Sequence, residues 1–311
     1  MDYKRWELRP DDELFPPALR DNSNAKVEVL YGIGNPECLS EAALAIIGAR
    51  RATPYGIAIA EMAGRVAGES GIVVVSGGAM GCDCAASRAA MDAGGKTVIV
   101  TGTGADRIYP SSSESVFRDA VARGGAIVSI EPWGTSPLPF VFPKRNVIIA
   151  ALCSVLLVAE AGERSGTMST ADAALEMDRT IYAAPGSIFS PTSQGTNRLI
   201  CEGALPICSE VDLEQRLTMD FGVLRVVAEG VAGPMGEIFS ALVAMPMRPD
   251  ELAPRLGQST LTLLRTLADY ESRGIVEHLP DGRYSLTAQA YEQYRLGGMQ
   301  AETAGEPARG E

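Results

Sequence analysis

The stretch Ala43-Leu-Ala-Ile-Ile-Gly-Ala-Arg-Arg-Ala-Thr-Pro-Tyr-Gly56 decides the fold of this chain. Its apolar first half predicts a short buried strand, and Thr53 and Pro54 suit the N-cap and the first position of a following helix. The free amides and positive end of such a helix attract anions. Because Arg50 and Arg51 lie beside them, we predict an anion site where this strand gives way to the helix, although both arginines also fit a solvated surface.

The same strand-then-helix pattern repeats through residues 42–210. Short apolar runs predict buried strands at Ala43–Gly48, Ile72–Ser76, Thr97–Thr101, Ala126–Ile130, Val155–Ala159 and Thr180–Ala184. A helical pattern follows each run, which is typical of a parallel sheet with helices on both faces. We therefore predict an α/β, extended Rossmann-like domain, whose ligands bind beyond the carboxyl ends of the strands, near the point where strand order reverses.

The remaining segments predict a second, smaller domain. Residues 1–41 form an N-terminal lead-in and residues 211–233 a linker. Three helical patterns and two strands joined by a Pro-Asp-Gly turn then predict a C-terminal winged-helix domain at residues 234–290. Its candidate recognition helix, residues 258–273, has no net charge, which favours contact with protein over DNA. The Gly-, Ala- and Glu-rich tail, residues 297–311, is predicted to be disordered.

Composition indicates a globular, cytoplasmic protein. The 311 residues are 46% hydrophobic, yet no apolar stretch approaches the about 20 residues needed to span a bilayer, and the first residues lack the apolar core of a signal peptide. Cys82 and Cys84 form a C-x-C without the second pair that a zinc site needs. Walker and G-x-G-x-x-G motifs are absent from the sequence, so we expect neither a metal nor a nucleotide cofactor.

Charge is unevenly distributed along the chain. Of the net charge of −12, residues 1–41 carry 5 cations and 9 anions, residues 42–203 carry 13 and 14, and residues 204–311 carry 9 and 16. The middle is nearly neutral, so a local basic groove can form there, whereas the acidic ends repel polyanions.

Further candidate binding residues follow other predicted strands. The run Phe142-Pro-Lys-Arg-Asn146 places two cations among aromatic residues that include Trp133 and Phe140, an arrangement that suits stacked bases of single-stranded nucleic acid. Ser165-Gly-Thr167 offers hydroxyls and amides at a helix start, and Gly77-Gly78 permits close backbone approach. Alternatively, the aromatic rings fill the core, and Ser165-Gly-Thr167 begins an ordinary capped helix.

The sequence offers few combinations of residues that could form a catalytic site. Because the chain has a single histidine, His278, outside the Rossmann-like region, a Ser-His-Asp or Cys-His device is excluded there. Asp83, Glu131 and Glu160 follow predicted strands and fit general acids or bases, but carboxylates at such positions also cap helices and hold arginines. We favour the structural roles.

Several motifs together resemble the DNA-processing protein A family, DprA, also called Smf. They are residues 45–56, Val75-Ser-Gly-Gly-Ala-Met-Gly-Cys-Asp83, Arg107-Ile-Tyr-Pro110, residues 142–150, Arg164-Ser-Gly-Thr167, Pro185-Gly-Ser187 and Gly195-Thr-Asn-Arg-Leu-Ile200. The resemblance implies a non-enzymatic protein that binds single-stranded DNA, forms homodimers, protects incoming DNA and loads the RecA recombinase during natural transformation. It also implies a DNA-binding pocket formed by Arg50, Arg51, Gly77, Gly78, Phe142, Lys144, Arg145, Asn146, Ser165, Gly166 and Thr167.

The chain also departs from the family pattern. Members usually carry Ser, His and Arg where Ala49, Ser87 and Val147 stand, so the resemblance implies a differently tuned pocket. A second hypothesis is a nucleotide-processing enzyme similar to the LOG, or lysine-decarboxylase-like, group, whose Pro-Gly-Gly-x-Gly-Thr-x-x-Glu signature this chain lacks. A plain nucleotide sensor is a third.

Overall fold

The computed structural model describes residues 4–225, 238, 241–242, 245–256, 259–288 and 290. The chain divides into two compact units, Met1–Val227 and Ala228–Glu311. Within the described residues, none of the helices is long and apolar enough to cross a membrane.

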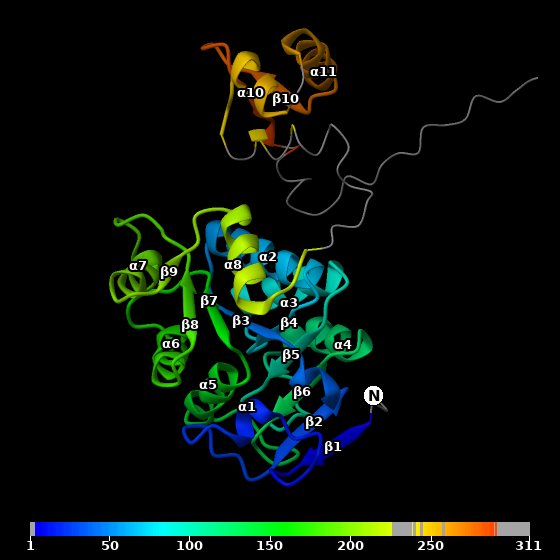
Figure 1. Ribbon diagram of the computed structural model, residues 1–311, viewed down its shortest axis with the longest axis vertical. Coiled ribbons are helices and arrows are strands. Elements are labelled where there is room, and N and C mark those ends of the chain that lie inside the picture. The colour runs from blue at the N-terminus through cyan, green and yellow to red at the C-terminus, as the bar shows by residue number, and fades with distance from the viewer. Residues whose placement is uncertain are drawn as a thin grey trace, which may run out of the picture. The chain divides into compact units, whose positions relative to one another are not determined.

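A nine-stranded sheet forms the centre of the first unit, with the order β1-β2-β6-β5-β4-β3-β7-β8-β9 (Figure 1). The strands are β1 (Arg5–Leu8), β2 (Leu30–Gly34), β3 (Ala43–Ile47), β4 (Val73–Ser76), β5 (Thr97–Val100), β6 (Ala126–Ser129), β7 (Val155–Val158), β8 (Thr180–Ala183) and β9 (Leu205–Pro206). Strands β3 to β9 pair in parallel, whereas β2 is antiparallel to both β6 and β1. The six predicted strands and the Rossmann-like α/β class are confirmed.

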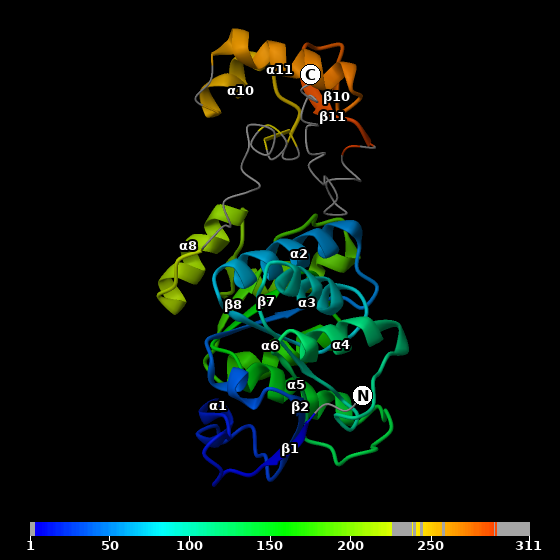
Figure 2. The same ribbon diagram turned by 90° about the vertical axis from the view of Figure 1, so that its right-hand side faces the viewer.

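Helices cover both faces of this sheet (Figures 1 and 2). Leu44 and Ile46 of β3 pack into the core under α2 (Pro54–Glu69), α3 (Cys82–Asp92) and α8 (Glu210–Phe221), while Ala45 and Ile47 pack into the core on the opposite face. That second core contains residues of α1 (Pro17–Arg20), α5 (Val141–Ala151), α6 (Gly166–Glu176) and α7 (Gln194–Cys201). Burial on both faces explains why each parallel strand is a continuous apolar run.

Three short 3-10 helices and one further helix complete the first unit. They are η1 (Pro36–Ser40), η2 (Ser111–Ser113), η3 (Pro191–Ser193) and α4 (Glu114–Ala122). Helix α3 approaches α2 closely at Gly64, where an added Cβ would lie 2.2 Å from the carbonyl oxygen of Ala86. A side chain there would push the two helices apart.

Two segments form regular structure that the sequence did not predict. Within the lead-in, β1 and β2 extend the sheet, and the Trp6 indole nitrogen donates to the carbonyl oxygen of Gly34 at 3.0 Å. Helix α8 (Glu210–Phe221) occupies the first half of the predicted linker, residues 211–233. Its Leu213 and Leu217 are buried, and its Asp220 accepts a hydrogen bond from the Tyr182 hydroxyl. Helix α8 is therefore part of the first unit.

The second unit contains α10 (Pro249–Arg255), α11 (Thr260–Ser272), β10 (Val276–His278) and β11 (Tyr284–Leu286). The two strands pair antiparallel, and a small core includes Leu252, Leu263 and Leu267. The first of the three helical patterns predicted for this unit spans residues 236–243, and most of it lies outside the described residues, as does all of the predicted tail, residues 297–311.

Candidate nucleic-acid interface

The predicted site residues gather at the carboxyl edge of the sheet. Strand order reverses at β3, which pairs with β4 on one side and with β7 on the other. The loops that leave these two strands contact each other, because the Thr167 hydroxyl donates to the carbonyl oxygen of Gly48 at 3.1 Å. Two helix N-termini, those of α2 and α6, begin beside this contact.

The N-terminus of α2 is occupied by a carboxylate of the protein itself. Glu160, which follows β7 and is only 2% exposed, accepts hydrogen bonds from the amide and the hydroxyl of Thr53 at 2.8 and 2.7 Å. An added Cβ at Gly56 would lie 2.4 Å from a Glu160 oxygen, so the glycine makes room for the carboxylate. The anion expected at this helix is thus Glu160, which acts as a cap.

The N-terminus of α6 is open. Ser165 is its N-cap residue but caps no backbone amide with its side chain, and its buried Oγ has no hydrogen-bond partner. A Cβ added to Gly166 would meet no atom within 4 Å. The Asn146 amide nitrogen donates to the Gly166 carbonyl oxygen at 3.3 Å and to Ser169 Oγ at 2.8 Å, which ties α5 to α6. This helix start has unused amides and space for an anion.

Cations surround an aromatic ring beside these helices. The Arg50 and Arg145 guanidinium carbons lie 5.4 and 5.9 Å from the centre of the Phe142 ring, and the Tyr109 ring lies 5.9 Å from it. The ammonium group of Lys144 lies 5.8 Å from the centre of the Phe140 ring. These distances are within the range of cation–π contact. We call Arg50, Phe142, Lys144 and Arg145 the cationic cluster.

Members of this cluster differ in exposure. Arg50 and Lys144, like the neighbouring Arg51, are exposed and form no ion pair with any described residue, and the neighbouring Phe140 is 63% exposed. Arg145 is 5% exposed and donates from Nη1 to the Val100 carbonyl oxygen at 2.9 Å. Burial lowers the pKa of Arg145 to about 10, against the opposing effect of Asp83. Arg145 therefore supports the cluster from inside.

The glycine loop lies against Arg145. An added Cβ at Gly77 would lie 1.9 Å from Arg145 Nη1 and 2.7 Å from Asp83 Oδ2. Gly78 has a φ of +66° and packs on Phe117. Burial raises the pKa of Asp83, while Arg145 and backbone amides lower it. Asp83 thus balances a buried cation, in line with the structural role favoured from the sequence, which did not identify Arg145 as its partner.

Other candidate residues lie elsewhere. The indole nitrogen of Trp133 donates to Glu7 at 2.7 Å, and its ring contacts Tyr31. Trp133 therefore packs against the N-terminal strands. His278 belongs to β10 in the second unit.

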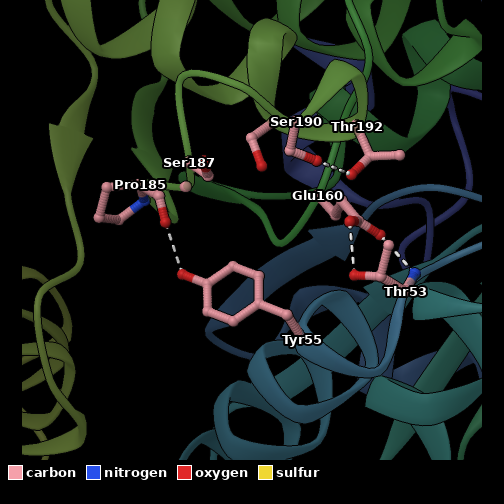
Figure 3. Close-up of a pocket in the computed structure, with 9 residues that line it drawn as sticks. Thr53, Tyr55, Glu160, Pro185, Ser187, Ser190 and Thr192 are labelled. Atoms are coloured by element: carbon pink, nitrogen blue, oxygen red, sulfur yellow. Dashed lines mark hydrogen bonds between the residues drawn. The ribbon is translucent and has the colours of Figure 1, made fainter.

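A pocket of about 320 Å³ adjoins Glu160 (Figure 3). It is lined by Thr53, Tyr55, Glu160, Pro185, Gly186, Ser187, Ser190, Thr192 and Ser193. Most of these residues belong to the loop between β8 and α7, which sequence reasoning did not include in the site. The only signal was the pair of motifs at residues 185–187 and 195–200.

Comparison with known proteins explains this arrangement. The model of the family described as DNA recombination-mediator protein A matches residues 7–218. The chain belongs to this family. It is 38% identical over 203 residues to the DNA processing protein DprA of Streptococcus pneumoniae, covering 65% of this chain and 71% of that protein. It is also 30% identical over 285 residues to protein Smf of Escherichia coli, covering 89% of this chain and 76% of that protein.

Solved structures of DprA proteins share the fold. The DprA of Streptococcus pneumoniae superposes with a TM-score of 0.63 at 34% identity, covering 71% of this chain and 75% of that one. The DprA of Helicobacter pylori, whose structure was studied for its single-stranded DNA binding mode, superposes with a TM-score of 0.62 at 28% identity, covering 71% and 98%.

Of the three departures from the DprA pattern, Ala49 is half-buried and directly precedes Arg50 of the cationic cluster, whereas the other two lie away from the open surface. Ser87 is fully buried in α3, and its hydroxyl has no hydrogen-bond partner. Val147 is half-buried and packs against the core, one turn from Lys144. Neither position is at the open surface of the cationic cluster.

Proposed function

We propose that this DprA-family protein binds single-stranded DNA at the carboxyl edge of its sheet. One observation carries the proposal: the open N-terminus of α6 is joined to the segments that hold the cationic cluster, through the contacts of Gly166 with Asn146 and of Thr167 with Gly48. The single-stranded DNA binding of the Helicobacter pylori relative supports it.

The chemistry of this edge favours single strands over duplex. Phosphates fit the unused amides of α6, with Arg50 and Lys144 beside them. Unpaired bases can stack on the exposed Phe140 ring, whereas the bases of a duplex are already stacked on one another. Arg51, Ser165 and Thr167 complete the proposed contact surface, and Gly77, Gly78, Arg145 and Asn146 hold it in place.

We further propose a mediator role rather than an enzymatic one. Glu160 and Asp83, two of the candidate acids and bases, are used to cap α2 and to balance Arg145. Extending the family resemblance, we propose that the protein protects incoming DNA and loads RecA as a homodimer. The second unit has two helices and a hairpin among its described elements, which supports a winged helix. The absence of net charge in the sequence of residues 258–273 supports contact with protein over DNA.

The test is a fluorescence-anisotropy titration of the purified protein with a labelled single strand and with the matching duplex. We expect tighter binding of the single strand and a binding constant that falls with salt. Equal or tighter duplex binding would contradict the proposal. Release of free base from nucleoside monophosphates would instead favour the nucleotide-processing hypothesis.

A further inference from the structure

The chain leaves α8 through a short segment, residues 222–225, which we call the strap. Gly222 ends the helix in the left-handed conformation, with a φ of +66°, and its amide donates to the Thr218 carbonyl oxygen at 2.9 Å. The rest of the strap forms no backbone–backbone hydrogen bond with any other described residue. Leu224 is 78% exposed, while Val223 packs partly against the core. The backbone and the apolar side chains therefore hold the strap weakly.

Arg225 supplies the main attachment of the strap. Its side chain is 8% exposed, and its guanidinium group contacts three carboxylates. Nε and Nη2 lie 2.6 and 2.5 Å from Glu69 Oε2, Nη2 lies 2.8 Å from Glu210 Oε1, and Nη1 lies 3.0 Å from Glu214 Oε2. The first of these carboxylates belongs to α2 and the other two to α8. Because hydrogen bonds between ionised groups are about twice as strong as neutral ones, this single side chain determines how firmly the strap is held.

A second arginine shares two of these carboxylates. Arg65 donates from its two Nη atoms to Glu210 at 3.0 and 2.7 Å, and it lies 3.8 Å from Glu69. Burial raises the pKa of Glu210, but hydrogen bonds and charge attraction from Arg65 and Arg225 outweigh this effect, so the pKa lies below its ordinary value. Glu210 therefore stays ionised at neutral pH, where the strap is held by charge.

Helix α8 has attachments that do not depend on the strap. Its Leu213 and Leu217 are buried, and its Asp220 accepts a hydrogen bond from the Tyr182 hydroxyl. The pair of Arg65 with Glu210 also joins α8 to α2 without Arg225. The helix can therefore stay in place when the strap leaves it.

We propose that the strap undocks as a unit from α2 and α8 while both helices remain folded, and that the contacts of Arg225 set how often it does so. Undocking adds four residues to the connection that leads to the second unit, so the reach of this connection grows by at most about 14 Å. The strap thus changes the length of the connection without unfolding of the first unit.

Limited proteolysis of the full chain with trypsin tests this proposal. Trypsin takes an arginine side chain into its specificity pocket, so the bond after Arg225 is cut only when the strap is undocked. When opening and closing are fast, the rate of cleavage follows the population of the open form. The double variant Glu69→Gln with Glu214→Gln should be cut after Arg225 at least about tenfold faster than wild-type protein, which corresponds to about 1.4 kcal/mol. Mass spectrometry identifies the products.

Glu202→Gln is the matched control. It breaks a pair with Arg198 at the end of α7 and leaves the contacts of the strap intact. Because it is a surface substitution, the rate of cleavage after Arg225 should stay within about twofold of the wild-type rate. Cleavage after Arg65 and Arg216 reports opening of α2 and α8, and it should remain slow in every variant.

The single variant Glu214→Gln keeps both contacts of Arg65 and serves if the double variant does not fold. It should be cut after Arg225 at least about threefold faster than wild-type protein. Equal rates of cleavage after Arg225 in wild-type protein and in the folded variants would overturn the proposal. Cleavage after Arg225 that occurs only together with cleavage after Arg65 or Arg216 would also overturn it, because the strap would then open with the helices and not as a separate unit.

Discussion

The N-termini of α2 and α6 have similar positions and N-cap residues, but they differ in what occupies them. Each follows a parallel strand at the same edge of the sheet, and each has a hydroxyl residue as its N-cap, Thr53 or Ser165. Glu160 occupies the first, and the second is open. The difference teaches that a helix start attracts an external anion only where the fold does not supply one of its own.

The hydrogen bonds of Glu160 explain why a ligand phosphate would not replace it at the N-terminus of α2. Each hydrogen bond to the Glu160 carboxylate contributes about 1.5–3 kcal/mol, and Glu160 is already tethered and buried. A phosphate would have to displace it and leave a buried charge uncompensated. Helix α6 imposes no such cost, which is why our proposal places the ligand phosphate at α6 and gives the N-terminus of α2 a structural role.

The largest expected effect is on stability, and it distinguishes the buried Arg145 from the exposed Lys144. Arg145→Ala should lower the free energy of unfolding of the first unit by about 3 kcal/mol or more, because it leaves the Asp83 carboxylate buried without an opposite charge. Lys144→Ala, at the exposed neighbour, should change it by about 0.5 kcal/mol or less. Denaturant unfolding followed by tryptophan fluorescence measures this, since Trp6 and Trp133 are the two tryptophans of the chain. Equal stabilities would place Arg145 at the surface.

The next effect concerns the exposed cations beside α6. Arg50→Ala combined with Lys144→Ala should weaken single-strand binding about tenfold or more and reduce the salt slope by about 1.4, at about 0.7 for each lost phosphate contact. The matched control is Lys96→Ala with Arg123→Ala, which removes two cations paired with Glu41 and Asp92. If the control variant loses as much affinity and slope, binding follows overall charge and not this edge.

A smaller effect is expected from removing the second unit. A protein that ends at residue 225 retains α8 and the ion pairs of Arg225 with Glu69, Glu210 and Glu214. It should bind a single strand within about threefold of the full chain. A folded truncated protein that binds more than about tenfold more weakly, a loss of about 1.4 kcal/mol, would show that the second unit contacts DNA.

The sequence predicted those parts of the molecule that depend on local patterns. The parallel strands are apolar throughout because helices cover both faces, so each is visible in its own residues. Strand β9 has two residues, and β1 has a single buried residue, Leu8, so neither carries such a pattern.

Contacts between residues far apart in the chain could not be predicted from the sequence. The contact of Glu160 with Thr53 joins positions 107 apart, and nothing in either motif indicates it. The burial of Arg145 likewise depends on Asp83 and on the glycine loop packed against it. The residue types at the site and the structural use of Asp83 and Glu160 were therefore predictable, but the partners of these carboxylates and the burial of Arg145 were not.

The most direct test of the proposed phosphate site fills the open N-terminus of α6 with a carboxylate. Gly166→Asp places a carboxylate at the N-terminus of α6, as Glu160 does for α2, and Gly166→Asn is its uncharged match; an added Cβ meets nothing within 4 Å. Titrating both variants with one single-stranded oligonucleotide at low salt should show Gly166→Asp binding about tenfold more weakly than Gly166→Asn, a difference of about 1.4 kcal/mol. Equal affinities of the two folded variants would contradict the claim that the N-terminus of α6 receives the phosphate.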